Sequence, residues 1–110
     1  MTDSSIRVGS DGSVLIIGGM TFSSTPNLYR ELEKHFQSKG QVINIDLGNV
    51  EHADSSGLAL LLEWQAMSNR KSRQLNITNA PDNLMRLAKL CEADVLLDMS
   101  GRDSVHNASG

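Results

Sequence analysis

The chain has 110 residues, which suits one domain, and its hydrophobic content of 39% is enough for one core. The formal net charge of −3 argues against general nucleic-acid binding, which needs a basic face. A single cysteine, Cys91, excludes an internal disulfide framework and is typical of a reducing compartment. Because the first residues lack the pattern of a signal peptide and no apolar run reaches membrane-spanning length, we expect a cytoplasmic protein without direct membrane insertion.

The first third of the chain predicts a hairpin and a helix. Short β-prone runs at residues 6–8 and 14–17 flank GSDGS, which is typical of a turn. Thr25 is suited to cap a helix that Pro26 begins and Gly40 ends. The residues at spacings of three and four on the face that we expect to pack inward are Leu28, Leu32, His35 and Phe36.

The rest of the chain alternates between strand and helix patterns. The expected elements are a strand at 41–47, a helix at about 56–69, a strand at 75–78, a helix at 81–91 and a short strand at 95–97. This alternation predicts an α/β fold, with a mixed, mainly parallel sheet of four to five strands and three to four helices. We assign residues 1–99 to the domain and residues 100–110, which have little apolar content, to a flexible tail.

The segment Asp54-Ser55-Ser56-Gly57 follows the strand at 41–47 and precedes a run of leucines. Such a loop, at the carboxyl end of a parallel strand, is where α/β folds usually place their sites. One interpretation is purely structural: Asp and Ser cap the helix, and Gly57 allows close packing. The other is functional, because the free amides and the positive end of the helix dipole also stabilise a phosphoserine at Ser55.

The helix at 56–69 carries apolar residues on two sides. At about 100° per residue, one side, expected to face the sheet, comprises Leu58, Ala59, Leu61, Leu62, Gln65 and Ala66. The opposite side comprises Leu60, Trp64 and Met67. Either another helix or the tail covers this second stripe, or it is a protein interface anchored by the only tryptophan.

The sequence favours no catalytic residue, metal or cofactor. His52, Asp54 and Ser55 are crowded into one turn, whereas a nucleophilic serine needs partners that converge from separate segments. The possible metal ligands, His35, His52, His106 and Cys91, lack ligand spacing. A small hydrolase therefore remains only as a minor hypothesis.

The run Asp54-Ser55-Ser56-Gly57-Leu58, between a strand and a helix, resembles the signature of STAS domains, the fold shared by sulfate transporters and anti-sigma factor antagonists. Within that family, residues 57–62 and 87–90, with 93–96 behind them, are most similar to the STAS subunit of the bacterial Mla phospholipid transporter. The resemblance covers nearly everything before the tail.

The resemblance implies a non-enzymatic, cytoplasmic subunit that binds the ATPase of an ABC transporter, in complex with an inner-membrane permease. It implies a role in ATPase assembly and activity, and in phospholipid movement that maintains outer-membrane asymmetry. In anti-sigma factor antagonists the residue after the motif's aspartate is phosphorylated, and here that position is Ser55. Mla subunits usually carry threonine there and then a small residue, whereas Ser55-Ser56 matches the antagonists. A partner-switching regulator controlled by an anti-sigma factor kinase is therefore the alternative.

The predicted partner-binding surface combines the motif with the second apolar stripe. Its members are Asp54, Ser55, Ser56, Gly57, Leu60, Trp64 and Met67, with Ser55 as the candidate phosphorylation site.

Overall fold

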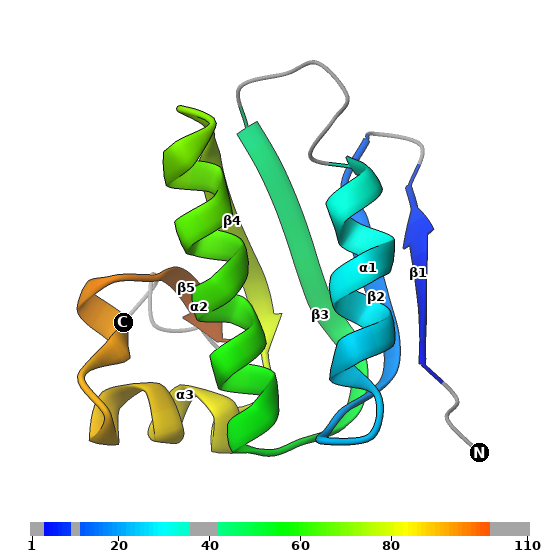
Figure 1. Cartoon of the computed structure of the whole chain (residues 1–110). Coiled ribbons are helices and arrows are strands. Elements are labelled where there is room, and N and C mark those ends of the chain that lie inside the picture. The colour runs from blue at the N-terminus through cyan, green and yellow to red at the C-terminus, as the bar shows by residue number, and fades with distance from the viewer. Residues whose placement is uncertain (1–3, 10–11, 36–41, 102–110) are drawn as a thin grey trace, which may run out of the picture.

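The computed structural model describes residues 4–9, 12–35 and 42–101 (Figure 1). In chain order its elements are β1 (Ser5–Val8), β2 (Val14–Met20), α1 (Thr25–His35), β3 (Val42–Ala53), α2 (Ser55–Arg70), β4 (Gln74–Ala80), α3 (Asp82–Leu90), the 3₁₀ turn η1 (Ala93–Val95) and β5 (Asp98–Gly101). Among these described elements, no helix is long and apolar enough to cross a bilayer.

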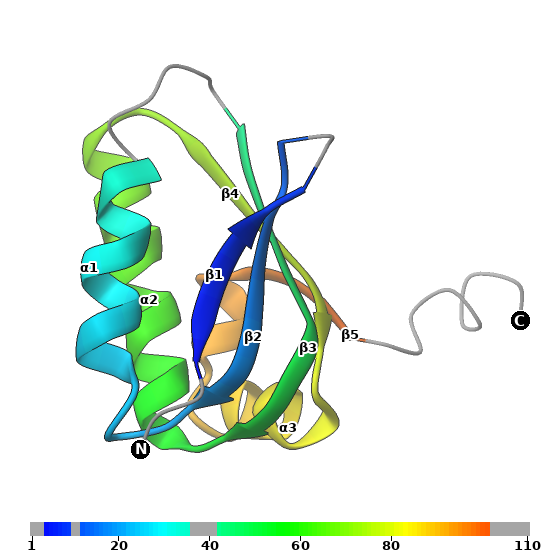
Figure 2. The same ribbon diagram turned by 90° about the vertical axis from the view of Figure 1, so that its right-hand side faces the viewer.

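The sheet has five strands in the order β1-β2-β3-β4-β5. The hairpin of β1 and β2 is antiparallel, and the pairs β2–β3, β3–β4 and β4–β5 are parallel. The helices α1 and α2 pack side by side on one face of this sheet, and α3 lies beside the first turns of α2 (Figures 1 and 2). The predicted α/β fold with a mixed, mainly parallel sheet is therefore confirmed.

The core lies between this face of the sheet and the helices. Strand residues alternate in direction, so β2 buries Val14, Ile16 and Met20 while its other side chains point away. The expected inward face of the first helix is confirmed for Leu28 and Leu32, which are fully buried. Gly40, Phe36 and the His35 side chain lie outside the described part of the chain.

The opposite face of the sheet is polar along its middle strands. On this face Asn44 of β3 is paired with Asn76 of β4, and Asn76 Nδ2 donates to Asn44 Oδ1 at 3.1 Å. Gln74 Nε2 in turn donates to Asn76 Oδ1 at 3.0 Å. These amide side chains satisfy one another in water-accessible positions, so this face needs no helix to cover it.

The last strand is not where the sequence places it. We expected it at 95–97, but Val95 ends the 3₁₀ turn η1, and the strand begins at Asp98. The chain leaves α3 through Glu92, whose backbone is left-handed at φ 57°, and Leu97 then enters the core. Residues 95–97 therefore connect the 3₁₀ turn to the last strand and are not part of the sheet. Residues 100 and 101, assigned to the tail, belong to β5, and 102–110 lie outside the described residues.

Candidate functional site

Asp54 caps α2, as the structural interpretation expected. Its backbone is extended, at φ −126° and ψ −167°, and its Oδ1 accepts a hydrogen bond from the Ser56 amide at 2.8 Å. Its carbonyl oxygen accepts the Gly57 amide at 2.9 Å and the Leu58 amide at 3.4 Å. The side chain thereby satisfies the Ser56 amide, which has no partner within the helix, and the carbonyl accepts the first hydrogen bonds of the helix backbone.

Asp54 also joins α2 to the loop between β2 and α1. Its amide donates to the Met20 carbonyl at 3.2 Å, and its Oδ2 accepts from the Phe22 amide at 3.4 Å. That loop is held from inside by Ser24, which is 2% exposed. Ser24 Oγ accepts from the Thr21 amide and donates to the Gly19 carbonyl, each at 2.8 Å. Two loops far apart in the sequence therefore form one fixed surface.

Phe22 lies on this surface with its side chain 82% exposed. Sequence reasoning missed it, because a single aromatic residue inside the polar run TFSST has no periodicity to mark it. The available signal was the position of the loop that holds Phe22. It follows a parallel strand, as does the segment Asp54-Ser55-Ser56-Gly57 (the DSSG loop), so both meet at the same edge of the sheet.

Gly57 is where α2 approaches β2 most closely. A Cβ atom at this position would lie 2.8 Å from the Met20 carbonyl oxygen and 3.0 Å from Met20 Cβ. The first of these neighbours is backbone and cannot move aside cheaply. The expectation that Gly57 allows close packing is confirmed, and this contact fixes how the first turn sits against the sheet.

Ser55 and Ser56 occupy the first two positions of α2. Ser55 is exposed, whereas Ser56 is half-buried and its amide is bound to Asp54. The neighbouring helix α3 supports this end of the sheet, because Asn83 Nδ2 donates to the Ala53 carbonyl at 2.8 Å. The Ser55 hydroxyl thus stands at the positive end of a helix, where an added phosphate is electrostatically tolerated.

The prediction that Leu60, Trp64 and Met67 form part of an exposed partner-binding surface is wrong. These side chains are 5%, 0% and 5% exposed, respectively, and all three belong to the core. The reason is that α1 and α3 contact α2 in addition to the sheet behind it, so more than one side of the helix is covered (Figure 1). The expected sheet-facing side was also partly wrong, since Ala59 is exposed. Trp64 is therefore a core residue, with no surface exposed to a partner.

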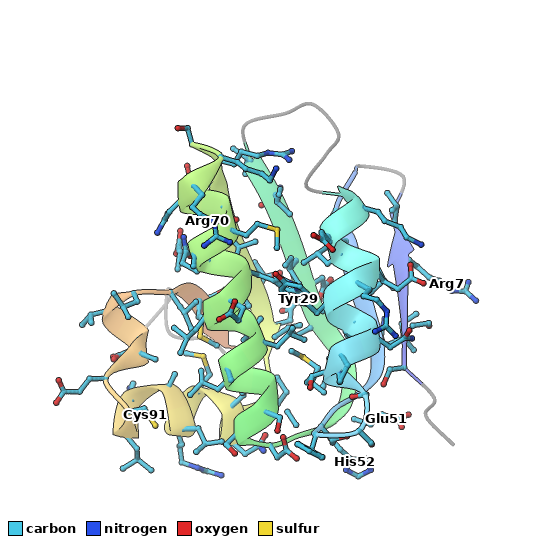
Figure 3. The ribbon with its side chains drawn as sticks, in the orientation of Figure 1. Arg7, Tyr29, Glu51, His52, Arg70 and Cys91 are labelled. Atoms are coloured by element: carbon cyan, nitrogen blue, oxygen red, sulfur yellow. The ribbon has the colours of Figure 1, made fainter. Side chains whose placement is uncertain are left out.

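The exposed surface of α2 instead forms one wall of a groove shared with α1. The groove has a volume of about 470 Å³ and is lined by Phe22, Thr25, Pro26, Tyr29, Arg30, Ser56, Ala59, Leu60 and Glu63. Tyr29 lies between the two helices (Figure 3). Leu60 forms part of the floor, and Ser56 connects the groove to the DSSG loop. The motif and the groove are therefore one continuous surface.

The arrangement does not assemble a catalytic triad from the crowded polar residues. Both carboxylate oxygens of Asp54 accept backbone amides, so the carboxylate is occupied in holding loops. Across residues 4–9, 12–35 and 42–101, no three His, Cys, Asp or Glu side chains are grouped to hold a metal ion. Cys91 lies at the end of α3, well apart from His52 (Figure 3).

Comparisons with known proteins identify the family and support the fold. Residues 7–101 match a protein family described as "Mlab, STAS domain". A solved structure, described as the anti-sigma factor antagonist SpoIIAA in its unphosphorylated form, superimposes with a TM-score of 0.68 over 96% of this chain and 95% of that one. The sequence identity is 11%, so this likeness concerns the fold. A search of curated proteins found no match.

Proposed function

The chain belongs to the STAS domain family described as Mlab, and from that membership we propose that it is a non-enzymatic subunit that binds the ATPase of a phospholipid-transporting ABC complex. The observation that carries the proposal is the family match over residues 7–101, nearly the whole described domain. In this proposal the protein is cytoplasmic, and it reaches the inner membrane only through the ATPase and its permease. Its task is to support ATPase assembly and activity, and thereby outer-membrane lipid asymmetry.

The proposed contact surface is the end of the sheet where Asp54, Ser55 and Ser56 meet the β2–α1 loop. A rigid docking surface costs little ordering entropy on binding. Here Asp54 holds both loops through backbone amides, and Gly57 fixes the helix against Met20. The exposed Ser55 hydroxyl is available for direct contact with the partner.

A second candidate is an anti-sigma factor antagonist switched by phosphorylation of Ser55. Two observations favour it: Ser55 is exposed in the first turn of α2, and the fold matches a solved antagonist. Phosphorylation adds about −1.5 to −2 charges beside Asp54 on the surface that docks. The helix end tolerates that charge, but an acidic or apolar partner surface does not, so phosphorylation releases the partner.

The test is affinity capture from native membranes and from the soluble fraction, with tagged wild-type protein and the variants Ser55→Ala and Ser55→Glu. We expect wild type to retain an ABC ATPase together with its permease, and Ser55→Glu to retain much less of both. Purified ATPase should then be more active, or better assembled, in the presence of the wild-type protein.

Capture of a serine kinase from the soluble fraction, with no ATPase from membranes, would establish the second candidate and reject the first. Equal capture by wild type and by folded Ser55→Glu would show that Ser55 is not part of the contact surface.

A further inference from the structure

We propose that the groove between α1 and α2 binds an amphipathic helix of the partner protein, with Phe22 as the aromatic anchor. This inference rests on the proposed function in one respect only, that a partner protein docks at this end of the molecule. The groove adjoins the DSSG loop through Ser56, so an occupant of the groove and a partner of the loop share one interface.

The groove calls for an apolar occupant. Phe22 is 82% exposed, and Pro26, Tyr29 and Ala59 continue the apolar surface along the groove, above the buried Leu60. Contiguous apolar patches on a soluble domain commonly mark interaction sites, and buried aromatic anchors dominate binding energies. The Phe22 backbone is held by Asp54, so the ring is presented from a fixed loop. An anchor presented in this way loses little freedom when it is covered.

The shape of the groove suits a helix. Its walls are two rows at helical spacing: 25, 26, 29 and 30 from α1, and 56, 59, 60 and 63 from α2. The two helices lie side by side along their length (Figure 1). A third helix can set its own ridge of side chains into the depression between such rows. At 1.5 Å per residue, the α2 wall from 56 to 63 is roughly 11 Å long, which corresponds to about two turns of the occupant.

Two charges at one end of the groove set the direction of that helix. Arg30 on the α1 wall and Glu63 on the α2 wall are both exposed, and both are the last members of their rows. The ion pair within α1, Lys34 Nζ to Glu31 Oε2 at 3.6 Å, involves neither of them. A partner helix that carries an acidic residue beside Arg30 and a basic residue beside Glu63 is favoured in one orientation and disfavoured in the reverse.

The first test uses the complex captured with full-length protein. A photo-crosslinking amino acid is placed at Ala59 in the groove or, as a control, at Asn44 on the polar face of the sheet. We expect crosslinks from position 59 to one amphipathic helical segment of the partner, and none from position 44. In parallel, Phe22→Ala should weaken binding by about tenfold or more. The matched control is Leu90→Ala on α3, which also removes an exposed side chain (81%) and should change affinity less than about twofold.

The outcomes separate this inference from the proposed function. An ABC ATPase that binds normally to Phe22→Ala and crosslinks only outside the groove overturns the inference and leaves the proposed function intact. Groove crosslinks to a kinase support the inference and reject the transporter role.

A second test needs no natural partner. A designed 14-residue helical peptide, apolar on one side and flanked by Glu on one edge and Lys on the other, is titrated into ¹⁵N-labelled protein. We expect chemical shift changes at Tyr29, Ala59 and Glu63, reduced in Phe22→Ala and absent for a peptide whose apolar positions are Gln. No saturable change in the groove at millimolar peptide, or changes confined to other surfaces, would contradict the proposal.

Discussion

The first turn of α2 and its middle turns serve different purposes. In the first turn, the Asp54 carboxylate binds backbone amides and Gly57 lets the helix approach Met20 closely, so the exposed Ser55 stands at a fixed place. In the middle turns, Trp64 and Met67 fill the space between sheet and helices. The contrast teaches that polar residues at a helix end can combine a structural role with recognition, whereas a fully covered apolar residue serves stability alone.

The largest expected effect tests the middle of α2. Trp64→Ala should destabilise the domain by about 3–5 kcal/mol, because it removes a fully buried ring from the core. Trp64→Phe should cost much less, since the indole Nε1 has no hydrogen-bond partner within the described structure that the change could remove. Urea denaturation followed by circular dichroism measures both. A Trp64→Ala variant that keeps full stability but loses partner binding would restore the interface hypothesis.

Gly57→Ala tests the backbone contact of the first turn. The added methyl group would meet the Met20 carbonyl oxygen at 2.8 Å, and we expect a loss of about 1–3 kcal/mol from overpacking. Gly19→Ala is the matched control: the nearest atom to its added Cβ is 3.7 Å away, and its stability should stay close to wild type. If both variants melt at the wild-type temperature, the close approach of α2 to β2 is not required.

Asp54→Ala tests the carboxylate that links the two loops. Loss of a side-chain cap costs about 0.5–2 kcal/mol, so the variant should remain folded. Hydrogen exchange should accelerate at the Ser56 and Phe22 amides, which donate to this carboxylate. Asp54→Asn keeps a hydrogen-bond acceptor, so its exchange rates at these amides should lie between those of wild type and Asp54→Ala. Unchanged exchange at Phe22 in Asp54→Ala would mean that the loop is held without Asp54.

The smallest effect on stability is expected for Ser55→Glu. A carboxylate in the first turn interacts favourably with the helix dipole by about 0.3–1 kcal/mol, so the melting temperature should stay constant or rise slightly. The same charge introduced by Asn69→Glu in the last turn of α2 should lower it. Partner binding should respond in the opposite way: Ser55→Glu should bind the partner more weakly, and Asn69→Glu should bind it as wild type does. A strong destabilisation by Ser55→Glu would place that side chain in a structural role.

The local features of the site were predictable from the sequence, but its surroundings were not. The cap at Asp54 follows from short-range chemistry, and the close packing expected at Gly57 is also present, although the sequence did not show that Met20 is its neighbour. Which side of α2 faces the sheet depends on the helices that flank it. The leucine-rich pattern of α2 is compatible with more than one orientation about the helix axis. Phe22 is part of the surface only because β2 and β3 end side by side, a fact of tertiary structure.

The order of the strands in space, β1 to β5, is the same as their order along the chain. During synthesis, each new strand can therefore add to the free edge of the sheet already formed, and no strand has to insert between two that are paired. Sequence separations between neighbouring strands stay as short as the intervening helices allow, which favours rapid folding. Both walls of the groove and the DSSG loop are complete by residue 63, so the chain can display its docking surface while its last strand is still being made.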